Sequence, residues 1–296
     1  MPPDPAALIR PATPRDVPAI RAILAAHGND RPPGQLLGPD VVGPYLAHLV
    51  AHHITMVSET PSEGVVAFGA VADAGIAWHL ADLFVQPDRL GQGLGRPLLA
   101  AMFGDRWPRT TFASDDPRAL PSYVRAGMAA RWVTLYVRGG REHAARAAAD
   151  PLARSLEVVD GDHAQIAALE LAWTGADRTI DHALWTTFPG ADPFVIRDAD
   201  GPVAVGYGRD RQVGPAARAV DRLVVRPGAE PVGPVLASIA RCMAAGETLD
   251  VTVPGPNPAL PVLLDLGFRI DDRDIYCAGP TDPVDPAFRL VNGGLL

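Results

Sequence analysis

The residues best suited to chemistry in this sequence form a glycine-rich loop between two apolar runs. Glycines at positions 91, 93 and 95 follow the apolar residues 83–85, and apolar residues at 94, 98, 101 and 102 then repeat at helical spacing. A strand, a glycine loop and a helix start can bind a phosphate or pyrophosphate, because glycine lets the backbone approach closely and the first amides of a helix attract negative charge. A plain glycine turn that joins a strand to a helix is the alternative.

Two better-known phosphate motifs fit this loop poorly. A P-loop requires Lys followed by Ser or Thr after its last glycine, whereas Arg96 and Pro97 stand there. A Rossmann loop follows the first strand of its domain and has an acidic residue about 20 residues further on, whereas this loop comes after at least three strand-like segments. Neither motif explains the spacing Gly91-x-Gly93-x-Gly95.

The loop resembles motif A of the GNAT superfamily of acyl-CoA N-acyltransferases, whose usual form is Arg/Gln-x-x-Gly-x-Gly/Ala. The corresponding run is Leu90-Gly91-Gln92-Gly93-Leu94-Gly95, with leucine at the first position. Downstream, Asp116-Pro-Arg-Ala-Leu-Pro-Ser-Tyr-Val-Arg-Ala-Gly-Met128 resembles the family's Asn-Pro-x-Ala-x-x-x-Tyr-x-x-x-Gly-Phe. Asp116 replaces Asn and Met128 replaces Phe, while Ala119, Tyr123 and Gly127 match. Two motifs in the right order and spacing are more specific than either alone.

The resemblance implies a site for an acyl-CoA, acetyl-CoA in the first instance. The amides of residues Leu90 to Arg96 would bind the pyrophosphate, with the Arg96 side chain as a charged assistant. The family also implies that the strand end Leu83-Phe84-Val85 splays from its neighbour and binds the pantetheine arm. One amide there, that of Phe84 or Val85, would polarise the thioester carbonyl. Asp116 stands where the family usually has an asparagine that can touch the cofactor.

The resemblance also implies that Tyr123 is the general acid that protonates the leaving thiolate; the alternative is an amphipathic residue at the edge of the core. His79 and Asp82, in the apolar run 76–85, are the candidates for the general base, acting directly or through water. An unbroken strand would place these two residues on opposite faces. The family often has a carboxylate near this point, which favours Asp82, whereas an imidazole titrates nearer to neutral pH. Each can also be purely structural.

Three histidines form a second candidate cluster. His48 and His52 are four residues apart and His53 follows, a spacing that can bind a metal ion on a helix. No carboxylate or cysteine completes the set nearby in the sequence. We therefore expect a solvated helix end and no metal.

Composition and charge exclude several classes of function. A chain of 296 residues with a formal net charge of −8 is long enough for two domains and argues against a general nucleic-acid partner. Cys242 and Cys277 lack metal-ligand spacing and fit a reduced, cytoplasmic setting. The N-terminus does not resemble a signal peptide, and no apolar run approaches the ~20 residues that span a bilayer. We expect no membrane partner.

The apolar pattern predicts the elements that position these residues. Strands are expected at 8–10, 54–58, 65–71, 76–85, 110–113 and 132–137, and helices at 13–27, 45–50, 94–102 and 120–125. Residues 28–44, rich in glycine and proline, predict a long irregular connection. This order fits a mixed α/β sheet with helices on both faces. With the resemblance, it predicts a mostly antiparallel, twisted sheet flanked by helices.

The second half of the sequence repeats the first. Pro227 follows Pro87, and Gly267 follows Gly127, by the same 140 residues. We therefore predict a tandem repeat, with a GNAT domain at 1–140, a linker at 141–153 and a degenerate GNAT-like domain at 154–296. The copies differ where the chemistry would be: Pro231 for Gly91, Pro234 for Leu94, Val235 for Gly95, Leu263 for Tyr123 and Arg222 for Asp82. Proline lacks an amide for an anion, so we expect one cofactor per chain.

The sequence thus predicts an N-acyltransferase that transfers an acyl group, acetyl in the first instance, from acyl-CoA to a primary amine of a small acceptor. The alternative is a non-catalytic acyl-CoA sensor or scaffold, which has no need of a phenol at position 123. The degenerate copy would brace the fold, wall the acceptor cleft or form the face of a homodimer.

Overall fold

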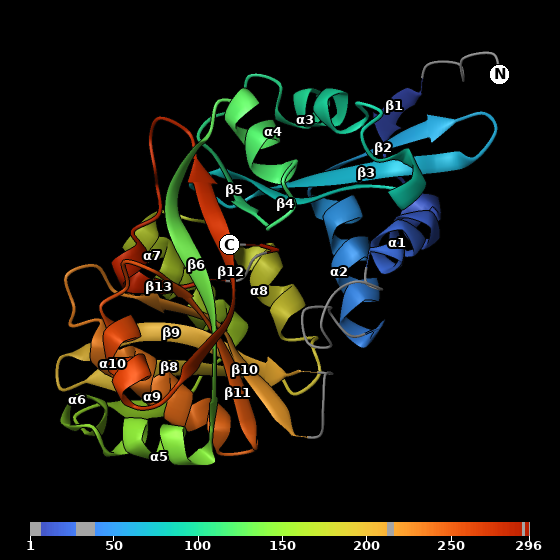
Figure 1. Ribbon diagram of the computed structural model, residues 1–296. Helices are drawn as coiled ribbons and strands as arrows, with labels where there is room; N and C mark the ends of the chain where they lie inside the picture. Colours follow the sequence, from blue (N-terminus) through green and yellow to red (C-terminus); the bar gives the residue numbers. More distant parts are fainter. Residues whose placement is uncertain (1–6, 28–38, 212–215, 292–293, 296) are drawn as a thin grey trace.

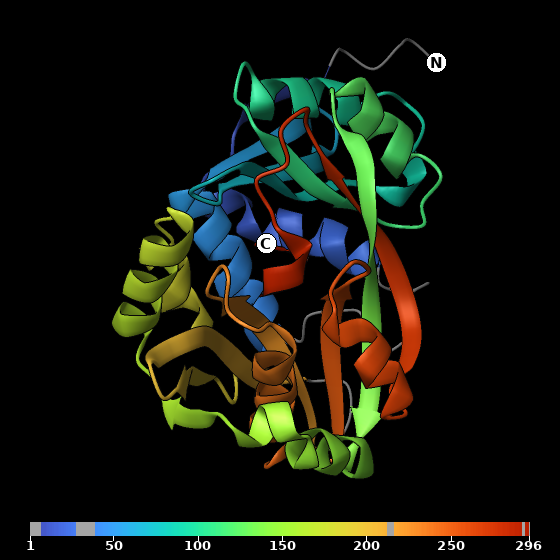
Figure 2. The same cartoon turned by 90° about the vertical axis from the view of Figure 1, so that its left-hand side faces the viewer.

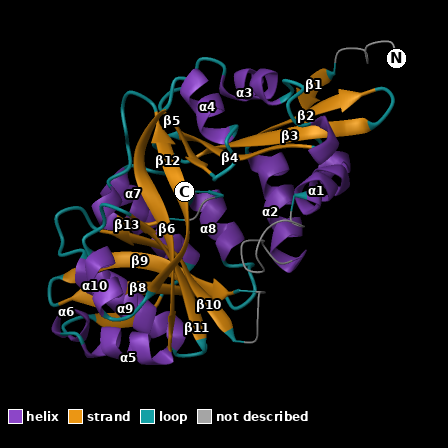
Figure 3. Cartoon of the chain, in the orientation of Figure 1, coloured by secondary structure: helices purple, strands orange, loops and turns teal. Residues whose placement is uncertain are grey.

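The computed structural model describes residues 7–27, 39–211, 216–291, 294 and 295. They form a thirteen-stranded, mostly antiparallel sheet with helices on both faces (Figures 1 and 3). None of the helices in these ranges is both long and apolar enough to cross a membrane.

Within the described residues, the first half supplies six strands and four α-helices. The strands are β1 (Leu8–Pro11), β2 (Ile54–Thr60), β3 (Gly64–Asp73), β4 (Trp78–Val85), β5 (Arg109–Ala113) and β6 (Ala129–Gly140). The helices are α1 (Val17–Ala26), α2 (Pro39–His52), α3 (Gly95–Phe103) and α4 (Ala119–Arg125). All six strands predicted from the apolar pattern are present.

The irregular connection predicted for residues 28–44 is wrong at its end. Residues 39–44 belong to α2, which contains Pro44, and residues 28–38 lie outside the described part of the chain. An interior proline costs a helix a hydrogen bond. Here Val41, Tyr45, Leu46 and Leu49 are buried on one side of α2, and this packing outweighs the local preference of proline.

The second half repeats this order of elements. Its strands are β7 (Glu157–Asp160), β8 (Asp192–Asp198), β9 (Gly201–Asp210), β10 (Ala217–Val225), β11 (Thr248–Pro254), β12 (Arg269–Ala278) and the short β13 (Arg289–Leu290). Its helices are α5 (Arg141–Ala149), α6 (Pro151–Arg154), α7 (His163–Thr174), α8 (Thr179–Trp185), α9 (Val232–Met243) and α10 (Ala259–Asp265). α10 begins 140 residues after α4, as the sequence repeat requires.

The two halves exchange their last long strands. The sheet order is β1-β2-β3-β4-β5-β12-β6-β11-β10-β9-β8-β7. β12 of the second half therefore lies beside β5 of the first half, and β6 of the first half lies beside β11 of the second. The only parallel pairs among the described strands are β4 with β5 and β10 with β11. Each half thus needs a strand of the other to complete its sheet.

Three large apolar clusters hold the helices on the sheet. In the first half, α3 and α4 cover one face and α1 and α2 the other (Figure 1). In the second half, α5 and α9 pack on one face. The cluster that holds α1 and α2 is shared between the halves, because it joins their residues, such as Ile20 and Leu46, to residues of α7 and α8, such as Ile166 and Trp185.

Candidate active site

β4 and β5 separate at the end of their short parallel pairing. The pairing ends at Leu80 and Thr111. Beyond it, β4 continues to Val85 along β3, and β5 continues to Ala113 along β12. The facing edges of the two strands are therefore unpaired with each other past Leu80. We call this place the β4–β5 wedge; it is the splay that the resemblance implied.

The edge of β4 that faces the wedge carries the amides of Leu83 and Val85. The Gln86 amide donates to the Val66 carbonyl of β3 at 2.9 Å. Successive residues of a strand direct their N–H and C=O groups to opposite sides, so Phe84 also bonds toward β3 while Leu83 and Val85 face away from it. Of the two amides considered for the thioester carbonyl, the register leaves that of Val85.

His27, at the end of α1, binds the same edge of β4. Its Nε2 lies 2.7 Å from the Val85 carbonyl oxygen, and because a carbonyl only accepts, Nε2 carries the proton. The imidazole also packs against Phe84, with 5.3 Å between ring centroids. The sequence analysis did not single out His27, since a lone histidine after a helix has no recognisable pattern. An extended ligand along Val85 would meet this imidazole.

A bulge in β4 brings His79 and Asp82 to the same face of the sheet. The register between β3 and β4 passes over Ala81, which has no residue opposite it. The extra residue adds one step to the alternation of side chains, so residues three apart lie on one side. The expectation of opposite faces assumed an unbroken strand and is wrong.

The surroundings of these two side chains differ. Asp82 is half-buried, and its Oδ2 accepts a 2.8 Å hydrogen bond from the Tyr45 hydroxyl of α2. His79 is 0% exposed, with Nδ1 3.0 Å from Thr110 Oγ1 and its ring against Phe112. Burial, and then the charge of Asp82, raise the pKa of Tyr45 well above its ordinary value, so the phenol stays a donor. Asp82 is the better placed of the two to exchange a proton with an acceptor.

Tyr123 of α4 lies at the narrow end of the wedge. It is buried in the apolar cluster of α3 and α4, and Figure 1 shows these two helices on the face of the sheet opposite α2. Thr111, the last residue of β5 that pairs with β4, is close enough to the phenol to influence its pKa. Burial first, and then the neighbouring Cys277 and Asp82, raise the pKa of Tyr123 above its ordinary value. The phenol is therefore a protonated group at the point where the strands separate.

The glycine loop lies between the end of β4 and the start of α3. Gly91 and Gly93 have φ angles of +79° and +82°, and a Cβ at either position would meet no atom within 4 Å. These glycines are therefore required by backbone conformation rather than by lack of space. α3 begins at Gly95, and its first amides have no partners within the helix. Leu90 and Leu94 are half-buried, and the side chains of Gln92 and Arg96 are exposed.

Asp116 lies just before α4 and is bound by a near neighbour. Its carboxylate accepts from the Arg118 amide at 2.8 Å and from Arg118 Nε at 2.9 Å. These hydrogen bonds lower the pKa of Asp116. The residue thus orders the start of α4, while its contact with a cofactor stays a prediction.

In the second half, the positions that correspond to Asp82 and Tyr123 carry different side chains. Arg222, in the position of Asp82, is 2% exposed, and its Nη2 donates to Glu170 Oε1 at 2.6 Å. Leu263, in the position of Tyr123, is 0% exposed. A guanidinium and an aliphatic side chain supply neither a base nor an acid for acyl transfer near neutral pH.

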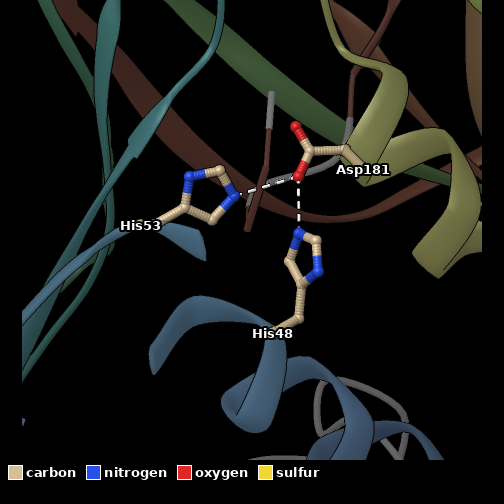
Figure 4. A group of neighbouring side chains, drawn as sticks. All are labelled: His48, His53 and Asp181. Carbon is tan, nitrogen blue, oxygen red and sulfur yellow. Dashed lines mark hydrogen bonds and ion pairs between the residues drawn. The ribbon is translucent and has the colours of Figure 1, made fainter. Parts of the chain in front are cut away.

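His48 and His53 meet a carboxylate of the second half (Figure 4). Their Nε2 atoms lie 2.7 and 3.0 Å from Asp181 Oδ1. Asp181 lies in α8, and its Oδ2 accepts from Arg178 Nε at 2.6 Å. The prediction of a solvated helix end is therefore wrong for His48 and His53, although His52 is exposed. The partner lies 128 residues beyond His53, where sequence proximity cannot reveal it.

The hydrogen bonds of this cluster favour a hydrogen-bonded junction over a metal site. The ligand atoms of His48, His53 and Asp181 all lie within 4.8 Å of one another, as a metal ion would need. However, the Asp73 amide donates to His53 Nδ1 at 3.3 Å, so the proton of a neutral His53 lies on Nε2, facing Asp181. A metal at Nε2 requires the other tautomer. We therefore describe the cluster as a hydrogen-bonded junction between the two halves.

The comparisons with known proteins concern the fold. The sequence matches no protein-family profile and no curated protein. A putative acetyltransferase from Pyrococcus horikoshii aligns with a TM-score of 0.68 at 12% identity, over 97% of this chain and 95% of that one. A tandem GNAT protein from the clavulanic acid biosynthesis pathway aligns with a TM-score of 0.61 at 17% identity, over 93% and 100%. A GCN5-related N-acetyltransferase from Anabaena variabilis aligns with a TM-score of 0.61 at 13% identity, over 92% and 72%. The chain has the tandem GNAT fold.

Proposed function

We propose that the chain is an acyl-CoA-dependent N-acyltransferase whose first half transfers an acyl group, acetyl in the first instance, to a primary amine of a small acceptor. The observation that carries this proposal is the convergence of three parts on the β4–β5 wedge. The Val85 amide lies on its edge, the Tyr123 phenol lies at its narrow end, and the glycine loop follows β4 directly. The likeness to structures named as acetyltransferases supports acyl transfer as the reaction class.

The proposed reaction uses the two faces of the sheet. The pyrophosphate would lie on the amides of residues 90–96, and the pantetheine arm along β4, with the Val85 amide on the thioester oxygen. The amine attacks the thioester carbon from the face that carries Asp82. The C–N bond forms, the C–S bond breaks, and the amine proton passes to Asp82 directly or through water. Tyr123, on the other face, gives its proton to the thiolate.

A panel assay tests this proposal against the alternative of a non-catalytic acyl-CoA sensor or scaffold. The protein is mixed with acetyl-, propionyl- or succinyl-CoA and a panel of primary amines, and released CoA is measured. Release that depends on an amine supports the enzyme. Binding of acyl-CoA with no amine-dependent release from any donor contradicts it and favours the sensor.

The loop glycines give a prediction about cofactor affinity. Gly93→Ala should weaken acetyl-CoA binding by roughly five- to thirtyfold. A side chain at a left-handed φ costs about 1–2 kcal/mol. The loop of the variant can avoid this cost by leaving the conformation that binds the cofactor, so binding has to supply it. Isothermal titration calorimetry measures the change. Gly228→Ala is the matched control, since Gly228 in the second copy has a φ of +83° and equally open surroundings. An equal loss of affinity in both variants would show a general effect on the fold.

A second prediction separates the two candidate bases. Asp82→Asn should lower kcat/KM for the amine by about 10²–10⁴-fold, the usual contribution of a general base. The Asn oxygen can still accept from Tyr45, so the acetyl-CoA Kd should stay near its wild-type value. An unchanged kcat/KM would transfer the role of base to His79 or to water.

A further inference from the structure

The second copy has the same wedge as the first, and the chain's own C-terminal segment fills it. β10 and β11 pair only as far as Val220 on β10. Past that point, β13 pairs antiparallel with β10 at Leu223 and Val224. On the other side, the Val291 amide donates to the Thr252 carbonyl of β11 at 3.3 Å. The segment is therefore bonded to both edges of the wedge.

The filled positions correspond to the proposed pantetheine site. Leu223 and Val224 follow Leu83 and Phe84 by the 140 residues of the sequence repeat. The first copy offers this strand end to a ligand, whereas the second copy has paired it with a strand of its own. The partner of β10 is an extended chain of amides and carbonyls. Pantetheine, the proposed ligand of β4, carries the same groups.

A buried asparagine holds the segment from the side of α10. Asn257 is 1% exposed, and its Nδ2 donates to the carbonyls of Pro286, Arg289 and Ala287 at 3.0, 3.1 and 3.3 Å. Asn257 lies just before α10, as Asp116 lies just before α4. A side chain at the start of α10 thus binds the backbone of the chain itself.

A carboxylate occupies the place of the pyrophosphate in the second copy. Glu230 Oε1 accepts from the Val232 amide at 2.8 Å, and Oε2 accepts from the Gly233 amide at 2.7 Å. These are the first amides of α9, the helix that corresponds to α3. Glu230 itself corresponds to Leu90 of the glycine loop. An internal anion therefore neutralises the helix start that a bound phosphate would otherwise use.

The last described residues, Gly294 and Leu295, lie against α2 of the first half, and Figure 2 shows the C-terminus between the two halves. A Cβ on Gly294 would lie 2.9 Å from the Tyr45 hydroxyl oxygen, so the tail lies directly against Tyr45. Leu295 is 2% exposed within the cluster shared by α2 and α8, and its carbonyl accepts from Arg178. Tyr45 is the residue that donates to Asp82.

We propose that residues 285–291 are a built-in ligand of the wedge between β10 and β11, and that Gly294 and Leu295, which follow them in the chain, form a wall of the acceptor site in the first copy. The second copy then acts as the holder of this wall and binds no acyl-CoA of its own. The role in acceptor choice rests on the proposed function, whereas the occupancy of the wedge does not. Gly294 is a positioning residue in this account, because it acts through Tyr45 on Asp82.

Hydrogen exchange and cofactor stoichiometry test the occupancy. In the wild type, the amides of residues 289–291 should be protected and calorimetry should find one acetyl-CoA per chain. In the wild type, Asn257 Oδ1 accepts from the Ala259 amide at 2.9 Å. Asn257→Ser keeps an oxygen that can accept from this amide, but it removes the Nδ2 group, whose three hydrogen bonds to the segment one shorter hydroxyl cannot replace. We expect exchange at 289–291 to become about tenfold faster or more, with no change at residues 83–85. Unprotected amides at 289–291, or a second acetyl-CoA per chain, would overturn the proposal.

A pair of glycine variants tests the wall independently. Gly294→Ala should displace Tyr45, speed hydrogen exchange in residues 41–50, and raise the KM of the best amine in the panel by about fivefold or more, with the acetyl-CoA Kd unchanged. Gly43→Ala, on α2 with Tyr45, is the matched control, because a Cβ at position 43 would meet no atom within 4 Å. Identical hydrogen exchange in residues 41–50 of the two variants would overturn the proposal that Gly294 forms a wall of the acceptor site. If the wild type releases no CoA with any amine, the proposed function fails, while the exchange data still decide this inference.

Discussion

Replacing Tyr123 by phenylalanine is expected to lower kcat by about 10²–10⁴-fold, the usual range for loss of a general acid. The acetyl-CoA Kd should stay near its wild-type value, because the phenol lies at the narrow end of the wedge and the proposed binding groups are backbone amides elsewhere. The ring is buried among the residues of α3 and α4, so phenylalanine can occupy the same space. Steady-state assay of CoA release and calorimetry together measure both quantities.

The pH dependence of the wild type offers a further check on this assignment. Burial and neighbouring charges raise the pKa of Tyr123 above the ordinary value of about 10 for a tyrosine. The phenol should therefore keep its proton up to about pH 10. Below that pH, the kcat of the wild type should show no fall with rising pH that is missing from the profile of Tyr123→Phe. Tyr207→Phe is the matched control, since Tyr207 is a buried tyrosine of the second copy whose hydroxyl lies 3.0 Å from His182. A kcat of Tyr123→Phe equal to that of this control would remove Tyr123 from the reaction.

The sequence revealed those parts of the candidate site whose residues are neighbours along the chain. The glycine loop, the end of β4 and the start of α3 lie within about twenty residues of one another, so the motif specifies their arrangement through local backbone geometry. The separation of β4 from β5 was implied by the family resemblance, which rests on this loop and on the spacing to Tyr123. Local pattern also gave the strands, because alternation of apolar side chains needs no knowledge of distant partners.

The parts that the sequence did not reveal depend on single residues or on distant contacts. The bulge at Ala81 is one unpaired residue in a strand, and it reversed the expected facing of His79 and Asp82. His27 becomes relevant only because α1 ends beside Val85. The exchange of β6 and β12 follows from pairing between halves, and no local preference records it.

The sequence repeat predicted which copy lost its polar groups but not what replaced them. Pro231 and Val235 indicate that an anion site is absent, yet they do not show that Glu230 now binds the first amides of α9. Nor does any motif indicate that β13 pairs with β10. A lost ligand leaves backbone donors and acceptors that must still be satisfied when buried, and the chain itself supplies the replacements.

The largest expected effect on stability concerns the junction between the two halves. Asp181→Asn should lower the free energy of unfolding by about 3–5 kcal/mol, the usual cost of removing one partner of a buried ion pair. Asp181 and Arg178 are 0% and 1% exposed, so the variant would leave the guanidinium without its charged partner. His48 and His53 would also lose the carboxylate on which both converge. Urea unfolding at neutral pH, followed by fluorescence, measures the change. Asp265→Asn, at an exposed site on α10, is the control.

The pH dependence of this stabilisation has a definite sign. Burial alone would raise the pKa of Asp181, but the hydrogen bonds from His48 and His53 and the charge of Arg178 lower it well below its ordinary value. A lowered pKa in the folded state means that the stabilisation is complete above the unfolded value of about 3.9 and is lost as the pH falls toward the folded value. The difference between wild type and Asp181→Asn should therefore narrow below about pH 4. A difference already lost at pH 6 would show that the carboxylate is not what joins α2 to α8.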